Sequence, residues 1–150
     1  MIVTFIGHST LPGDYDLYDK LRKSILELVP KNEKISFYCG GYGEFDALCA
    51  KVCRELKPEL PCSETVYVTP YLKEDERMRW YMDGGQYDTV IYPPLERVPY
   101  KYAIVKRNQW MVDRADLIFS YVTVSWGGAA GALTYAKKQN KRIIDLAQRN

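Results

Sequence analysis

Two glycine-rich turns hold the residues of this chain that are best suited to chemistry. The first contains Gly40, Gly41 and Gly43, and the second runs through Ser125, Trp126, Gly127, Gly128 and Ala129. Each turn follows an apolar run typical of a strand and precedes a stretch with helical spacing. Glycine lets the backbone approach an anion closely, and the first N–H groups of a helix point at that anion with the positive end of the helix dipole behind them. The turns therefore predict a site for a phosphorylated small molecule.

A carboxylate, Asp46, follows the first glycine turn and lies near the start of the predicted helix. This residue either complements the helix dipole or accepts hydrogen bonds from the ribose hydroxyls of a ligand. The dinucleotide fingerprint needs a third glycine where Phe45 or Asp46 stands, and neither turn continues as Gly-Lys-Ser/Thr. We therefore expect neither a nicotinamide dehydrogenase nor a P-loop protein, and we assign no cofactor.

The helix predicted after the second turn begins almost without side chains, which costs helix propensity. Close packing on a sheet explains one face of this helix, which carries Ala129 and Ala136. Ser125, Gly127 and Gly128 lie at the turn itself, where the amides are free. We expect phosphate or ribose phosphate to bind there, together with Ala129.

Two further side chains are expected to reach the same site. Arg107 falls on the edge of an apolar helical stripe that includes Ile104 and Met111, so its guanidinium either extends to solvent or binds a phosphate or carboxylate. In either case we expect its removal to change stability little. His8 ends the first predicted strand, and it either donates to the ligand or caps the helix that follows.

An alternating order of strands and helices positions these residues. Strands are predicted at 2–6, 34–38, 65–69, 89–92, 116–122 and 142–146, and helices at about 14–29, 44–57, 74–82, 100–114 and 128–139. This order predicts an α/β fold, a three-layer sandwich with a mostly parallel central sheet flanked by helices. Ligands bind such sheets at the carboxyl ends of the strands, so both turns should face one site. The chain has no linker or repeat, and residues 1–150 are predicted to form a single domain.

Composition narrows the function classes. The chain has 21 Lys+Arg against 19 Asp+Glu, scattered along its length, and this balance weighs against nucleic acid as a partner. No apolar run is long enough to span a membrane and no signal peptide is recognised, so we expect a cytoplasmic protein without a membrane partner. Four cysteines without a C-x-x-C pair, and one histidine, predict no metal site.

Taken together, these motifs resemble the SLOG superfamily, the Rossmann-like group that contains the Smf/DprA proteins and the LOG phosphoribohydrolases. The matching features are Gly7-His8, Gly40-Gly41-x-Gly43, the stretch 107–116 and the helix start at Gly127-Gly128. The similarity covers nearly the whole chain and is closest to the YpsA-like branch. It implies a nucleotide or nucleotide-derived ligand, of the ribose-phosphate or ADP-ribose type. The residues implied to line its site are the two glycine turns with Gly7, His8, Asp46, Arg107 and Asn108.

Departures from the hydrolase pattern bear on catalysis. LOG enzymes carry Pro-Gly-Gly-x-Gly-Thr-x-Glu at the second turn, whereas here no proline precedes Gly127 and Thr134 replaces the glutamate. A threonine cannot act as a carboxylate base or stabilise a developing positive charge. We therefore assign no catalytic residue and expect a sensor or carrier. The alternatives are a nucleoside monophosphate hydrolase that uses Glu44 or Asp46, a DprA-like single-stranded DNA binder, and an interaction module whose turns stay empty.

The segment 70–99 is rich in aromatic residues, among them Tyr71, Trp80, Tyr81 and Tyr87. Tyr and Trp side chains combine an apolar ring with a polar O–H or N–H group, so they can cover a sheet edge or form an interface between copies of the chain. A homo-oligomer is therefore one expected arrangement. The other interpretation is a lid whose rings stack on a nucleobase.

Overall fold

The computed structural model describes residues 1–11, 13, 16–72 and 76–147 of the chain. Six strands form one sheet in the order β4-β3-β2-β1-β5-β6, and all five pairings are parallel. The strands are β1 (Ile2–Gly7), β2 (Ile35–Cys39), β3 (Ser63–Val68), β4 (Thr89–Ile91), β5 (Leu117–Tyr121) and β6 (Ile143–Asp145). The helices are α1 (Leu17–Leu28), α2 (Glu44–Glu55), α3 (Glu76–Asp83), α4 (Ala103–Arg114) and α5 (Gly128–Lys138), with a short 3-10 helix, η1 (Tyr100–Tyr102), before α4.

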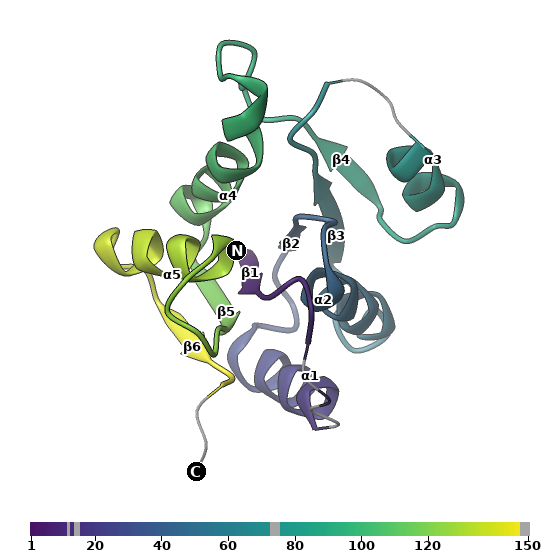
Figure 1. The fold of residues 1–150 in the computed structure, drawn as a ribbon. Coiled ribbons are helices and arrows are strands. Elements are labelled where there is room, and N and C mark those ends of the chain that lie inside the picture. The colour runs from purple at the N-terminus through teal and green to yellow at the C-terminus, as the bar shows by residue number, and fades with distance from the viewer. Residues whose placement is uncertain (12, 14–15, 73–75, 148–150) are drawn as a thin grey trace.

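Helices cover both faces of the sheet: α1, α2 and α3 lie on one side and α4 and α5 on the other (Figure 1). The chain builds the sheet outward from β1 to β4, then returns through α4 and places β5 on the other side of β1. The predicted α/β, Rossmann-like sandwich is confirmed. The order also puts the topological switch point, where such sheets bind ligands, between β1 and β5. Residues 14 and 74, where two helices were predicted to begin, lie outside the described residues.

Buried aromatic side chains join the central strands under α1 and α2. The ring of Phe5 in β1 lies 6.2 Å from that of Phe37 in β2 and 6.1 Å from that of Phe119 in β5. Leu21 of α1 and Phe45 of α2 are fully buried against this layer. Burying a large apolar side chain contributes roughly 1.5–3 kcal/mol, so this cluster fixes the strands whose ends form the site.

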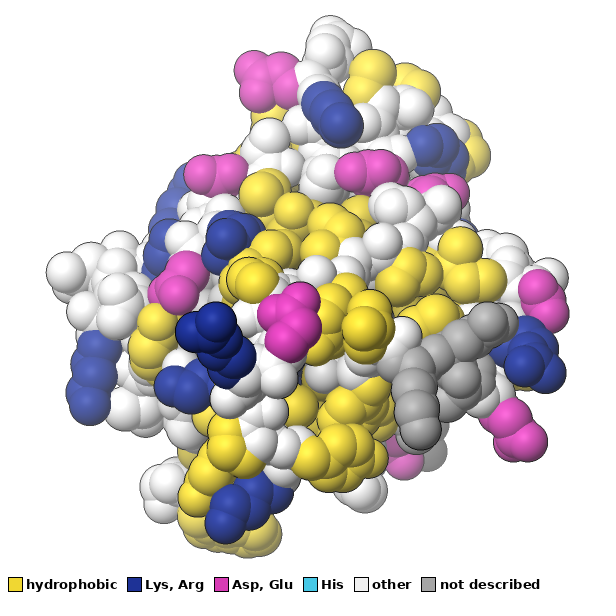
Figure 2. Space-filling view, turned by 90° about the horizontal axis from the view of Figure 1, so that it is seen from above, with side chains coloured by type: hydrophobic (Ala, Val, Ile, Leu, Met, Phe, Trp, Pro, Cys, Tyr) yellow, Lys and Arg dark blue, Asp and Glu magenta, His cyan; other side chains and the backbone are white. Residues whose placement is uncertain are grey.

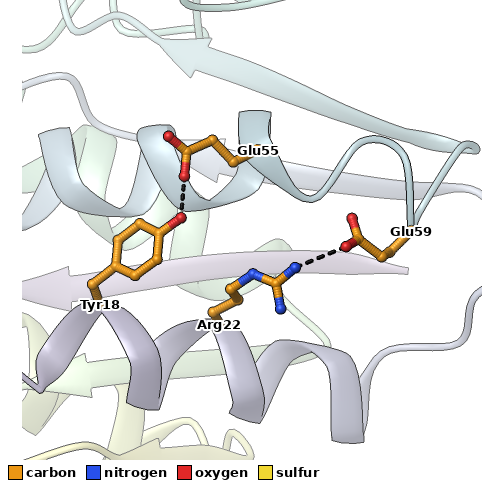
Figure 3. Close-up of polar contacts among 4 residues, drawn as sticks. All are labelled: Tyr18, Arg22, Glu55 and Glu59. Atoms are coloured by element: carbon orange, nitrogen blue, oxygen red, sulfur yellow. Dashed lines mark hydrogen bonds and ion pairs between the residues drawn. The ribbon is translucent and has the colours of Figure 1, made fainter.

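Polar contacts add little to the packing of α1 on α2. The Tyr18 hydroxyl bonds the carboxylate of Glu55, and Arg22 forms an ion pair of 2.7 Å with Glu59 (Figure 3). Both side chains of the ion pair are more than a third exposed, and such pairs contribute at most about 1 kcal/mol. Among the described helices, none is long and apolar enough to cross a membrane.

Candidate functional site

A cavity of about 500 Å³ opens at the carboxyl edge of the sheet, where the ends of β1 and β5 meet the first turns of α4 and α5. This is the switch point of the sheet. The residues predicted from the sequence that line the cavity are Gly7, His8, Asp46, Arg107, Asn108, Gly127, Gly128 and Ala129.

The other predicted residues lie elsewhere. Gly41 and Gly43 border a second cavity of about 440 Å³, which they share with Trp80 and Tyr81 of α3. Ser125 is exposed and is not among the lining residues of either cavity. Gly40 lies against Arg107, and a Cβ there would come within 3.1 Å of Nη2. The first turn therefore reaches the cavity of the second turn through Tyr42 and Asp46, whereas its glycines do not line that cavity.

The N-terminus of α2 is closed by the loop that follows β1. The Glu44 N–H donates to the Ser9 carbonyl at 2.8 Å, and the Phe45 N–H faces the His8 carbonyl at 3.4 Å. A Cβ at Gly43 would come within 2.6 Å of the Ser9 Cα. The expectation of free N–H groups at the first glycine turn is therefore wrong for the start of α2, because loop carbonyls already occupy them.

The N-terminus of α5, in contrast, is open to the cavity. No side chain caps it, and within the described residues the N–H groups of Gly128 and Ala129 have no acceptor. A Cβ at Gly127 or at Gly128 would meet no atom within 4 Å. An open helix start of this kind can accept an anion, so the second turn stays the predicted anion site.

Arg107 lies in the centre of the buried face of α4, and only 2% of its surface is exposed. Its Nη1 donates to the Gly40 carbonyl at 2.7 Å and to the Val68 carbonyl at 2.8 Å, and its Nε donates to Asn108 Oδ1 at 2.9 Å. The arginine neither lies at the edge of the helix nor extends to solvent, and its buried hydrogen bonds lead us to expect a loss of stability on its removal, contrary to the expectation from sequence. It ties the ends of β2 and β3 to α4 at one wall of the cavity.

Asp46 shapes the first glycine turn from inside. Its Oδ2 accepts a hydrogen bond from the Tyr42 N–H at 3.1 Å. Burial raises the pKa of this carboxyl to about 6, although Arg107 and the backbone N–H groups of Tyr42 and Gly40 oppose the rise. The cavity wall thus carries a carboxyl with a pKa of about 6. The other candidate carboxylate, Glu44, accepts from the Leu11 N–H at 2.6 Å and is not a lining residue.

His8 bridges the two loops at the switch point. The Thr123 backbone N–H donates to its Nε2 at 2.8 Å. Because a backbone N–H can only donate, Nε2 is the acceptor and the neutral ring carries its proton on Nδ1. Among the described residues no hydrogen bond from His8 to the start of α1 at Leu17 is observed, so the capping role considered for His8 finds no support.

Sequence reasoning missed three lining residues that carry hydroxyl groups, namely Ser9, Thr10 and Thr123. Ser9 and Thr10 directly follow the end of β1, so the rule that ligands sit beyond strand ends would have found them. In the described part of the chain, no group of three or more His, Cys, Asp or Glu side chains could hold a metal ion.

Comparison with known proteins supports the fold. No family model matches the chain. The uncharacterized SPbeta prophage-derived protein YoqJ of Bacillus subtilis is 28% identical over 145 residues, which cover 85% of this chain and 84% of that protein. DNA processing protein A (DprA) of Helicobacter pylori, described in a study of its single-stranded DNA binding mode, has a TM-score of 0.67 at 17% identity.

Our chain aligns over 99% of its length with 66% of the H. pylori protein, a little under two thirds. The molybdenum cofactor carrier protein of Chlamydomonas reinhardtii has a TM-score of 0.60 at 14% identity, with coverage of 99% of this chain and 78% of that one. At these identities the likeness establishes a shared Rossmann-like fold.

Proposed function

We propose that the cavity between β1 and β5 binds a nucleotide or nucleotide-derived ligand, of the ribose-phosphate or ADP-ribose type, and that the protein is a sensor or carrier of it. The observation that carries this proposal is the open N-terminus of α5, where uncapped N–H groups and the absence of a Cβ leave room for phosphate. In this proposal residues 1–150 form one nucleotide-binding domain of the SLOG type, closest to the YpsA-like branch.

The remaining walls suit the other parts of such a ligand. Ser9, Thr10 and Thr123 supply hydroxyls for phosphate or ribose oxygens, and His8 offers the N–H of Nδ1. The buried Arg107 adds positive charge at the wall beside Asn108. An anionic ligand with several oxygens fits this set better than an apolar ligand does.

Calorimetry tests the proposal with inorganic phosphate, ribose 5-phosphate, adenosine monophosphate and ADP-ribose as probes. Gly128→Val places a side chain in the ligand volume, and its Cβ meets no protein atom within 4 Å, so we expect a loss of nucleotide affinity of tenfold or more. Gly131→Val is the matched control, because Gly131 also lies in α5 with open space around it but does not line the cavity. Equal nucleotide affinity in wild type and Gly128→Val contradicts the proposal, as does the absence of binding by every probe.

One observation favours an N-glycosidase acting on nucleoside monophosphates as the second candidate. Asp46 lines the cavity and burial raises its pKa to about 6, a value suited to proton transfer near neutral pH. Chromatography of free base released from a panel of nucleoside monophosphates tests this activity. If wild type releases free base and Asp46→Asn does not, the result supports the N-glycosidase. If wild type releases no free base, the sensor or carrier function is favoured.

Single-stranded DNA is the ligand of the DprA neighbour, and a short oligonucleotide therefore belongs in the same binding panel. The formal charge of this chain is only +2, and on the face shown in Figure 2 Lys and Arg side chains are interspersed with Asp and Glu. Strand-binding proteins use a continuous basic groove, so we expect weaker binding of DNA than of nucleotides.

A further inference from the structure

The three tryptophans of the chain have different surroundings. Trp110 stacks on Tyr38, with ring centroids 5.8 Å apart, and Trp80 lies 5.4 Å from the ring of Tyr81. Trp126 is 74% exposed, and in the described part of the chain it has no aromatic partner. The packing of the fold accounts for Trp110 and in part for Trp80, but it gives Trp126 no role.

Trp126 stands where the proposed ligand would meet it. It directly precedes Gly127, the N-cap of α5, and it lines the cavity. Two more large apolar side chains at the cavity are exposed, Ile104 of α4 at 36% and Val124 at 38%. Apolar groups from two elements thus surround the cavity next to the amides that would hold phosphate.

We infer that Trp126 is the platform on which the nucleobase of the ligand stacks, with Ile104 and Val124 beside it, so that the site selects nucleotides over base-free ribose phosphates. This inference rests on the proposed function. A nucleobase is planar, and the face of any of the bases can stack on an indole ring. Phosphate at the α5 amides places the rest of a mononucleotide beside the preceding residue, which is Trp126.

The test compares Trp126→Ala with wild type by calorimetry, using adenosine monophosphate, ADP-ribose and ribose 5-phosphate as probes. Stacking on one ring contributes roughly a tenfold change in affinity or more when the ring is removed. We expect Trp126→Ala to weaken the binding of both nucleotides by that factor and to leave the affinity for ribose 5-phosphate unchanged. Trp126→Phe, which keeps an aromatic face, should restore most of the nucleotide affinity.

Trp80→Ala is the matched control, since Trp80 is 63% exposed but borders the second cavity. We expect it to bind all probes as wild type does. Nucleotide binding should also quench tryptophan fluorescence in wild type and Trp80→Ala, and this quenching should be absent in Trp126→Phe. Because Trp126 is mostly exposed, its replacement should leave the thermal midpoint close to that of wild type.

The outcomes separate this inference from the proposed function. If wild type binds none of the probes, the proposed function fails and the inference fails with it. If wild type binds ribose 5-phosphate as tightly as both nucleotides, or if Trp126→Ala weakens all probes equally or none of them, the phosphate site stands and the stacking role is wrong.

Discussion

Two helices of this protein begin with the same backbone conformation and have opposite surroundings. Gly43 caps α2 with φ 93° and ψ 173°, and Gly127 caps α5 with φ 93° and ψ 179°. The loop after β1 lies against Gly43 and occupies amides of α2, whereas Gly127 faces open space at the cavity. A glycine at the start of a helix can therefore either allow another segment of the chain to pack against it or leave space for a ligand.

The reason for the difference lies in the sheet order. Helix α2 packs beside β1, and its Phe45 fills the space next to Gly7, where a Cβ would come within 2.1 Å of the phenyl ring. The chain leaving β1 therefore passes directly over the start of α2. Helix α5 lies on the other face of the sheet, and in the described chain no segment covers its start.

The largest effect is expected at Arg107, which holds the first glycine turn to the sheet. Arg107→Ala removes donors from the Gly40 and Val68 carbonyls and leaves Asp46 without its nearby positive charge. Leaving a buried acceptor without its hydrogen bond costs about 1–3 kcal/mol, and this substitution affects two of them. Urea unfolding measures this loss, and a midpoint equal to that of wild type would show that the first turn does not depend on Arg107.

A matched pair of substitutions separates backbone strain from packing. Gly127→Ala and Gly43→Ala both force a side chain into a conformation that is nearly restricted to glycine, at about 1–3 kcal/mol each. Only Gly43→Ala adds a collision with Ser9, and overpacking costs about 1–3 kcal/mol more. Thermal or urea unfolding should place Gly43→Ala below Gly127→Ala, and equal losses would contradict the difference in their surroundings.

The carboxyl of Asp46 should make stability depend on pH. Its pKa in the folded protein is about 6, above the usual value, so the folded state holds this proton to a higher pH than the unfolded state does. The resulting stabilisation is complete below pH of about 4 and is lost as the pH rises to about 6, and it amounts to at most about 3 kcal/mol. Urea unfolding of wild type and Asp46→Asn across this range should show the slope in wild type alone.

The smallest effect is a gain at Gly131, which lies one turn inside α5. Its backbone φ is ordinary and a Cβ there would meet no atom within 4 Å. Gly131→Ala should therefore raise stability by about 0.5–1 kcal/mol through helix propensity. A thermal midpoint below that of wild type would show that the open side of α5 is more constrained than its geometry indicates.

Local patterns predicted every helix and strand that the structure describes, with ends displaced by a few residues, because each element has its own apolar periodicity and turn residues. The same reasoning misplaced the face of α4. It put Ile104 on the apolar stripe and Arg107 at its edge, whereas Arg107 is buried and Ile104 is 36% exposed. An arginine is read as polar from sequence, and the carbonyls that make its burial favourable come from β2 and β3.

The sequence by itself determined the alternating elements, the parallel sheet and the two glycine helix starts, since these follow from neighbours along the chain. Only the tertiary structure decided which start is open, because Ser9 and Gly43 lie far apart in sequence and meet through the position of β1 beside α2. Asp46 and Arg107 were both expected at the site, but only the tertiary structure decided that burial raises the pKa of Asp46 while the charge of Arg107 opposes that rise. Contacts of this kind depend on the order of strands in the sheet, which local periodicity does not encode.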